Sequence, residues 1–116
     1  MNYWMSFKIK TSDPFDAEVK RLSKKYRSLK LDLHELGKEL MENPFQGVEI
    51  APNIRKVRLA ISSKGRGKSG GARVITYNLL VSEHDGVIYL LLIYDKADAS
   101  NVKIDVIKEI IKGLGL

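Results

Sequence analysis

The chain has 116 residues, with 20 lysines and arginines against 14 aspartates and glutamates, so its formal net charge is +6. This length predicts one domain over residues 1–116. Cysteine is absent, which excludes disulfides, thiolate metal sites and a cysteine nucleophile. The two histidines lie far apart in the sequence, and nothing near either one supports a metal centre or a two-histidine nuclease.

The apolar segments are too short for a membrane or secretion signal. No apolar region of signal-peptide length occurs at the N-terminus. The longest apolar run, Val87 to Tyr94, is far too short to span a bilayer and predicts a strand buried on both faces. We therefore expect a cytoplasmic protein without a membrane partner.

The first half of the chain predicts a strand and two helices. Apolar and polar residues alternate from Trp4 to Thr11, as in a strand. Asp13 as a cap and Pro14 as the first helical residue then signal a helix start. Two amphipathic patterns follow, separated by a break over residues 28–31, and the second ends at Asn43. They predict an antiparallel helical hairpin.

The second half predicts a loop over residues 45–53 and three strands, Ile54–Ser62, Ala72–Ser82 and Val87–Asp95. A glycine-rich loop over residues 63–71 separates the first two strands, and a short hairpin turn joins the last two. Ser100 is expected to cap a C-terminal helix rich in isoleucine. The result is an α+β fold with an N-terminal strand, a helical hairpin, a three-stranded antiparallel meander and a C-terminal helix.

The positive charge is concentrated in one segment. Between Ile50 and Ser82 there are seven basic residues and no carboxylate, whereas the rest of the chain has 13 basic residues against 14 acidic ones. Cations this close repel one another, so binding to a polyanion is the simplest reason for their coexistence. The seven are Arg55, Lys56, Arg58, Lys64, Arg66, Lys68 and Arg73.

Strand periodicity divides these residues into a patch and its surroundings. Lys56 and Arg58 lie two apart and share one strand face, while Val57 and Leu59 point to the core. Arg73 begins the next strand, and Lys96 follows the last one. We predict that Lys56, Arg58, Arg73 and Lys96 form a cationic patch on one sheet surface, with the loop residues Lys64, Arg66 and Lys68 at its rim.

The segment Gly65 to Gly71 is not a nucleotide-binding P-loop. The P-loop pattern needs a glycine where Ser62 stands, and a helix where this chain continues as a strand. Backbone N–H groups in a glycine-rich turn beside lysine and arginine can still hold a phosphodiester. The alternative interpretation is a plain flexible hairpin loop.

Four segments closely resemble the RelE/HigB-like toxins of bacterial type II toxin–antitoxin systems: residues 42–47, 56–61, 65–75 and 91–96. The resemblance covers nearly the whole chain. It implies a RelE-like fold and an endoribonuclease that needs neither a metal nor another cofactor. Such an enzyme cuts mRNA in the ribosomal A site, by attack of a ribose 2′-OH on the adjacent phosphate, and is silenced by a cognate antitoxin protein.

The resemblance also implies roles for individual residues. The expected catalytic residues are Lys56, Arg58, Arg73 and Lys96, and the expected RNA-binding residues are Arg55, Lys64, Arg66 and Lys68. Lys56 and Arg58 match the paired basic strand positions of the family, Arg73 its arginine after the glycines, and Lys96 its basic position after the last strand. The chain departs from members that carry a catalytic tyrosine near the last helix, since it has Ser100-Asn101-Val102 there.

The chemistry of transesterification is compatible with these residues. The reaction needs a base, an acid and charge stabilisation at the phosphate. We hypothesise that Lys96 or Lys56 transfers protons while Arg58 and Arg73 stabilise phosphate charge. Two alternatives remain: a ParE-like, gyrase-inhibiting toxin without nuclease activity, and a degenerate, non-catalytic RNA-binding module.

Overall fold

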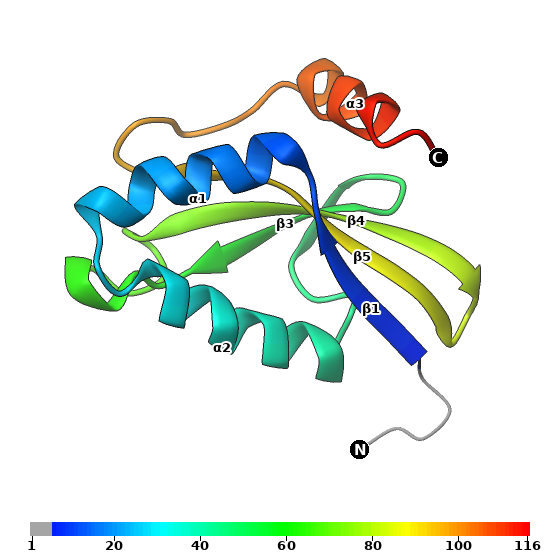
Figure 1. Ribbon diagram of the computed structural model, residues 1–116, viewed down its shortest axis with the longest axis horizontal. Coiled ribbons are helices and arrows are strands. Elements are labelled where there is room, and N and C mark those ends of the chain that lie inside the picture. Colours follow the sequence, from blue (N-terminus) through cyan, green and yellow to red (C-terminus); the bar gives the residue numbers. More distant parts are fainter. Residues whose placement is uncertain (1–5) are drawn as a thin grey trace.

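Residues 6–116, which the computed structural model describes, build one mixed sheet flanked by helices (Figure 1). The strands are β1 (Ser6–Thr11), β2 (Val48–Ala51), β3 (Ile54–Leu59), β4 (Ala72–Ser82) and β5 (Asp85–Asp95). The helices are α1 (Asp13–Lys25), α2 (Leu29–Glu42) and α3 (Ile104–Gly113), with a 3₁₀ turn η1 at Ser62–Lys64.

The sheet has the order β1-β5-β4-β3-β2, in which β1 runs parallel to β5 and the other pairs are antiparallel. The predicted antiparallel meander is therefore confirmed as β3-β4-β5. The apolar run in β5 is explained by its place, because β1 and β4 flank it and helices cover both of its faces. Among residues 6–116, no helix is both long enough and apolar enough to cross a membrane.

The predicted strand count was one too low. β2 lies within residues 45–53, which were predicted as a loop, and it pairs with β3 across a turn at Asn53, whose φ is 63°. It is only four residues long, two exposed and two half-buried, which is too short for alternation to mark a strand. The predicted strand Ile54–Ser62 ends earlier, at Leu59, because η1 turns the chain away. Trp4, at the predicted start of β1, lies outside the described residues.

The starts of two helices also differ from the prediction. Ser12, rather than Asp13, caps α1: its Oγ accepts a hydrogen bond from the N–H of Phe15 at 3.1 Å. The same buried hydroxyl donates to the Leu91 carbonyl at 2.6 Å. Leu91 is the extra residue of a β-bulge, since Ile75 pairs with Leu92 while the next residue of β4 pairs with Leu90. Ser12 therefore ties the start of α1 to an irregular point in β5.

Helix α3 begins at Ile104 rather than directly after Ser100. Lys103, just before the helix, is extended. The Asn101 side chain accepts a hydrogen bond from the N–H of Val102 at 2.9 Å, and Val102 packs against the core. This apolar anchor delays the helix by three residues.

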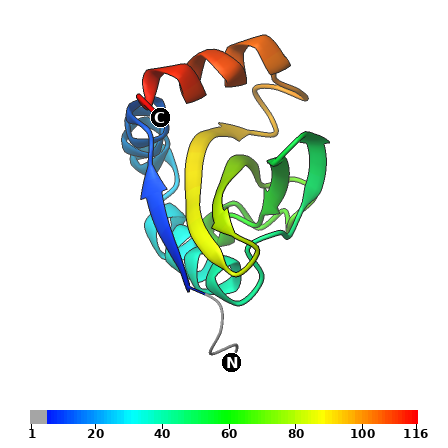
Figure 2. The same ribbon diagram turned by 90° about the vertical axis from the view of Figure 1, so that its right-hand side faces the viewer.

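Two hydrophobic cores lie on opposite faces of the curled sheet (Figure 2). The first, on what we call the hairpin face, is covered by α1 and α2 and includes Leu22, Leu36, Val57, Val74 and Ile93. The second, on the α3 face, is covered by α3 and includes Ile54, Ile75, Tyr89, Tyr94 and Ile107. Val57 and Leu59 are buried on the hairpin face, as the alternation in β3 predicts.

A buried carboxylate joins three elements at the end of β5. Asp95 has no exposed surface, and it accepts hydrogen bonds from Tyr26 Oη and Lys64 Nζ, each at 2.6 Å. The backbone N–H of Ala97 donates to the same carboxylate at 3.0 Å. Burial alone would raise the pKa of Asp95, but the hydrogen bonds from Lys64, Tyr26 and Ala97 outweigh it and lower the pKa to about 2.

This low pKa predicts a specific loss of stability in acid. The folded-state pKa of Asp95 lies below its ordinary value of 3.8, so the ionised carboxylate stabilises the fold above about pH 4. The contribution, roughly 2 kcal/mol, is lost as the pH falls from about 4 to about 2. Urea unfolding of the wild type across this range should show the loss.

The variant Asp95→Asn should be less stable at neutral pH and should lack this part of the acid dependence. The matched control is Asp98→Asn, because Asp98 is exposed and three residues away. If Asp95→Asn retains the full wild-type fall between pH 4 and pH 2, Asp95 is not the group responsible.

Candidate functional site

The strand register aligns two arginines and a tyrosine across the sheet. Arg58 of β3 lies directly opposite Arg73 of β4, and Arg73 lies opposite Tyr94 of β5. All three are on the α3 face, because the adjacent residues of their strands are buried on the hairpin face. We call Arg58 and Arg73 the arginine row. Lys56 lies two residues along β3 from Arg58 and therefore on the same face.

The arginine row is unfavourable for the fold by itself. Like charges directly opposite each other on neighbouring strands destabilise a sheet. Across residues 6–116, neither Arg58 nor Arg73 forms an ion pair with a carboxylate. The fold therefore maintains two adjacent positive charges that a bound anion would compensate.

Arg73 also holds the glycine loop, residues 65–71. Its guanidinium donates hydrogen bonds to the carbonyls of Lys68 at 2.9 Å, Ser69 at 3.2 Å and Ala72 at 3.1 Å. At the end of this loop the Gly71 carbonyl accepts a hydrogen bond from the backbone N–H of Lys96 at 3.0 Å. Arg73 thus orders the loop, and the loop sets the backbone position of Lys96.

The basic residues around the glycine loop open onto two shallow hollows. One, of about 270 Å³, is lined by Lys64, Arg66, Gly70, Lys96 and Ala97. The other, of about 160 Å³, is lined by Arg58 and Lys68 together with Glu39 of α2, Gln46, Gly47 and Val57. The structure therefore gathers Lys56, Arg58 and Arg73 on the sheet, and places Lys96 with Arg66 beside the loop. Arg66 and Lys68 are exposed.

Two predicted RNA-binding residues have other partners. The Lys64 ammonium is committed to Asp95, and its side chain is only 14% exposed. Arg55 points to the hairpin face, where its guanidinium lies 5.7 Å from the centre of the Phe45 ring and 3.8 Å from the Glu49 carboxylate. Neither residue joins the arginine row.

Tyr94 is a candidate that sequence reasoning took only as a core residue. It is buried, with 7% of its surface exposed, and within the described chain its hydroxyl has no hydrogen-bond partner. Burial raises the pKa of Tyr94, and the nearby charge of Arg73 opposes that shift. The spacing of Tyr94 and Lys96 indicates a shared face, but the pairing with Arg73 depends on the bulge at Leu91, which the sequence does not reveal.

No protein-family model matches the chain. Within residues 6–116, the histidine, aspartate and glutamate side chains form no group of three that could hold a metal ion. The chemistry that the described site offers is that of arginine, lysine and a buried phenol.

Close packing at Gly71 generates a prediction. A Cβ added there would collide with the Leu59 carbonyl oxygen, so Gly71→Ala must displace either the glycine loop or β3. We expect the free energy of unfolding to fall by at least about 2 kcal/mol. Gly113→Ala is the control, because a Cβ there meets open space near the end of α3. That control should leave stability unchanged or raise it by up to about 1 kcal/mol. Equal stability of both variants in urea unfolding would refute the packing argument.

The two buried tyrosines should respond differently to loss of the hydroxyl. Tyr26→Phe removes the donor to Asp95 and should cost about 1–3 kcal/mol, because it leaves a buried acceptor with one partner fewer. Tyr94→Phe removes a hydroxyl that has no partner in the described chain, so stability should be unchanged or slightly higher. Thermal unfolding of both variants tests this difference, and a large loss in Tyr94→Phe would contradict it.

Proposed function

We propose that the protein is the toxin of a type II toxin–antitoxin system, with a RelE-like fold, and that it cleaves mRNA as a ribosome-dependent, metal-independent endoribonuclease. The observation that carries this proposal is the arginine row, two like charges held directly opposite each other beside Lys56 and next to an ordered glycine loop. The sequence resemblance described above supports the same conclusion.

The register suggests how the reaction would be arranged. Along β4, Arg73 lies between Ile75, which pairs with Lys56, and Gly71, whose carbonyl binds the N–H of Lys96. Lys56 and Lys96 are therefore on opposite sides of the arginine row. In-line displacement at phosphorus has its attacking and leaving oxygens on opposite sides of the phosphate.

This arrangement assigns separate tasks to the basic residues. A phosphate bound by Arg58 and Arg73 would have one lysine near the attacking 2′-OH and the other near the leaving 5′-oxygen. The arginines would stabilise the charge that develops on the phosphate. Which lysine acts as base and which as acid stays open.

Dependence on the ribosome and silencing by an antitoxin are both compatible with this surface. The hollows around the glycine loop are small and open, so the chain by itself offers little to orient a flexible mRNA. Ribosomal RNA would supply that positioning. An antitoxin with complementary acidic charge would be captured rapidly by the same basic face and would cover it.

A non-catalytic RNA-binding module is the second candidate, favoured by one observation. The Arg73 guanidinium donates three hydrogen bonds to backbone carbonyls, so its presence is partly explained by the loop that it holds. A module of this kind would bind RNA through the same face and cut nothing.

Arg58→Ala is the sharpest test, because Arg58 is exposed and its removal relieves the repulsion within the arginine row. We expect unchanged or higher thermal stability, together with a loss of cleavage of about 100-fold or more. Lys96→Ala should also abolish cleavage, and Lys38→Ala on α2 should not. The measurement is mapping of mRNA 5′ ends in bacteria after induction, with cuts expected in phase with codons.

Other outcomes would select the alternatives. Continued toxicity with intact mRNA and damaged DNA would replace the nuclease with a gyrase-inhibiting toxin. Binding of RNA without any cuts, unaffected by Lys96→Ala, would indicate the non-catalytic module.

A further inference from the structure

We propose that the helical hairpin carries a second binding surface, which docks on the phosphate backbone of folded RNA. Residues 20–30 contain six basic residues and no carboxylate, although the chain outside residues 50–82 is nearly neutral overall. We call this set the hairpin patch, and all six residues are exposed. They are Lys20, Arg21, Lys24, Lys25, Arg27 and Lys30.

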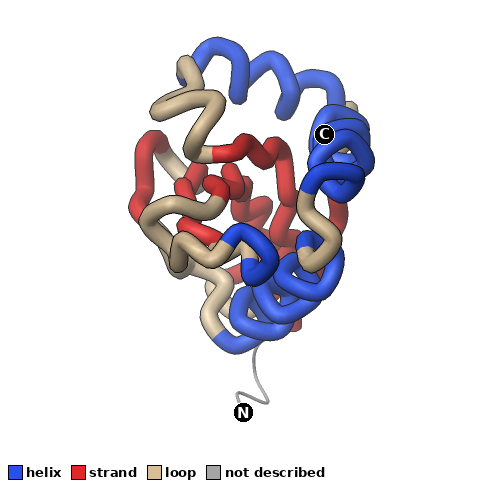
Figure 3. Tube along the Cα trace, turned by 90° about the vertical axis from the view of Figure 1, so that its left-hand side faces the viewer, coloured by secondary structure: helices blue, strands red, loops and turns tan. Residues whose placement is uncertain are grey.

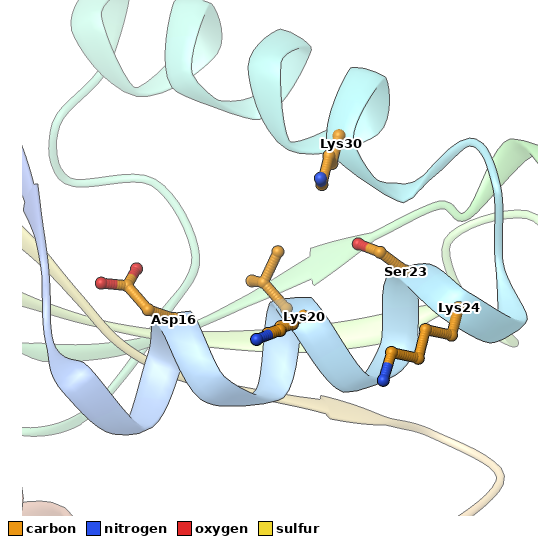
Figure 4. A pocket seen from close by; sticks show the side chains of 6 residues that line it. Asp16, Lys20, Ser23, Lys24 and Lys30 are labelled. Atoms are coloured by element: carbon orange, nitrogen blue, oxygen red, sulfur yellow. The ribbon is translucent and has the colours of Figure 1, made fainter.

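Three lysines of this patch line one hollow between two helices. Lys20 and Lys24 project from α1 and Lys30 from the first turn of α2, around a hollow of about 480 Å³ (Figure 4). Ser23, a small side chain, lies between them, and Asp16 lies toward the start of α1. The hollow is wide and open, as a surface for an extended polyanion would be.

Part of this arrangement is unfavourable for the helices, although Lys24 in the last turn of α1 suits the helix dipole and Asp16 lies four residues before Lys20. Lys20 and Lys24 are four residues apart, and like charges at this spacing destabilise a helix. Lys30 stands in the first turn of α2, where the helix dipole already makes the environment positive. An anion lying over the hollow would offset both effects, which is why we infer a ligand rather than a merely solvated surface.

Carboxylates compensate only part of the patch. Arg21 is paired with Glu18 at 2.9 Å and approaches Asp98 at 3.9 Å. In the described part of the chain, the other five basic residues of the patch form no ion pair with a carboxylate. Asp32, in the first turn of α2, is occupied by hydrogen bonds from Ser28 and from both the backbone and the hydroxyl of Ser62.

The hairpin patch is continuous with the basic residues beside the glycine loop. The turn between α1 and α2 lies beside η1 (Figure 3). The hydroxyl oxygens of Ser28 and Ser63 are 2.9 Å apart there. The Tyr26 ring has the Lys25 ammonium 5.3 Å and the Lys64 ammonium 5.6 Å from its centre. Lys64 in turn lines the hollow that includes Arg66 and Lys96. The two basic regions therefore meet at this end of the molecule through Lys64, whose own charge is paired with Asp95.

The layer that carries the patch identifies the kind of RNA. α1 and α2 cover the hairpin face, whereas the arginine row is on the α3 face. A single strand bound at the arginine row therefore does not lie across the hairpin patch. A folded RNA that surrounds this end of the molecule would contact both surfaces, so the patch fits structured RNA rather than the strand that is cut. The choice of RNA as the partner rests on the proposed function.

The test compares two triple variants with equal net charge. The patch variant replaces the three lysines that line the hollow: Lys20→Gln, Lys24→Gln and Lys30→Gln. The control variant replaces three exposed lysines on and beside α3: Lys103→Gln, Lys108→Gln and Lys112→Gln. Binding of each to purified ribosomes is measured from 50 to 200 mM salt. We expect the patch variant to bind ribosomes at least 10-fold more weakly than wild type. The slope of log K against log salt, which is negative, should become less steep by about 2–3. The control should change binding by less than about 3-fold and keep the slope within about 1 of wild type.

The outcomes separate this inference from the proposed function. A reduced affinity of the patch variant alone supports the patch, even if the wild type cuts no mRNA and the nuclease proposal fails. Equal weakening of both variants would mean that only net charge matters, which would overturn the inference. Unchanged binding of the patch variant would overturn it as well. Thermal unfolding checks that both variants fold, and the patch variant should be at least as stable as wild type.

Discussion

The buried carboxylate of Asp95 is the constraint on which the arrangement of the basic surfaces depends. It holds η1 through Lys64, the end of α1 through Tyr26, and the chain after β5 through the N–H of Ala97. Its ionised form stabilises the fold at neutral pH, although burial offsets part of the attraction between Asp95 and Lys64. It also has a geometric role: three segments distant in sequence are fixed at one end of the sheet, and Lys96 follows directly.

A second constraint is the cost of keeping like charges together. The sheet supports Arg58 opposite Arg73 because apolar residues of the same strands, such as Val57 and Val74, are buried on the other face. The hydrogen bonds from Arg73 to the carbonyls of the glycine loop offset part of the repulsion between the two arginines. Stability supplied by the hairpin-face core thus maintains a surface that is unfavourable until an anion binds, as is common at functional sites.

Local sequence patterns predicted most helices and strands. The features that they did not predict depend on pairing between residues far apart in the sequence. Alternation and helical spacing are properties of neighbouring residues, so the two helices of the hairpin and the β3-β4-β5 meander could be predicted. β2 could not, because so short a segment becomes a strand only by pairing with β3. The role of Lys64 was hidden for the same reason, since its partner Asp95 lies 31 residues away. The hairpin patch is hidden in the sequence for a different reason: the net charge outside residues 50–82 averages residues 20–30 with the acidic residues of the neighbouring segments.

The arginine row and the hairpin patch differ in how the energy of binding RNA can affect the reaction. Contacts made equally by the bound substrate and the transition state strengthen binding without accelerating the reaction. The hairpin patch, on the face opposite the arginine row, is of this kind, because it lies away from the reacting phosphate. The binding energy of the hairpin patch contributes to the reaction if the folded RNA also holds the strand that is cut. Docking on that RNA would then fix the arginine row against one phosphate of the strand. A nuclease with a shallow site and no histidine pair would then need its substrate presented by another molecule. A docking surface separate from the reacting groups meets that requirement.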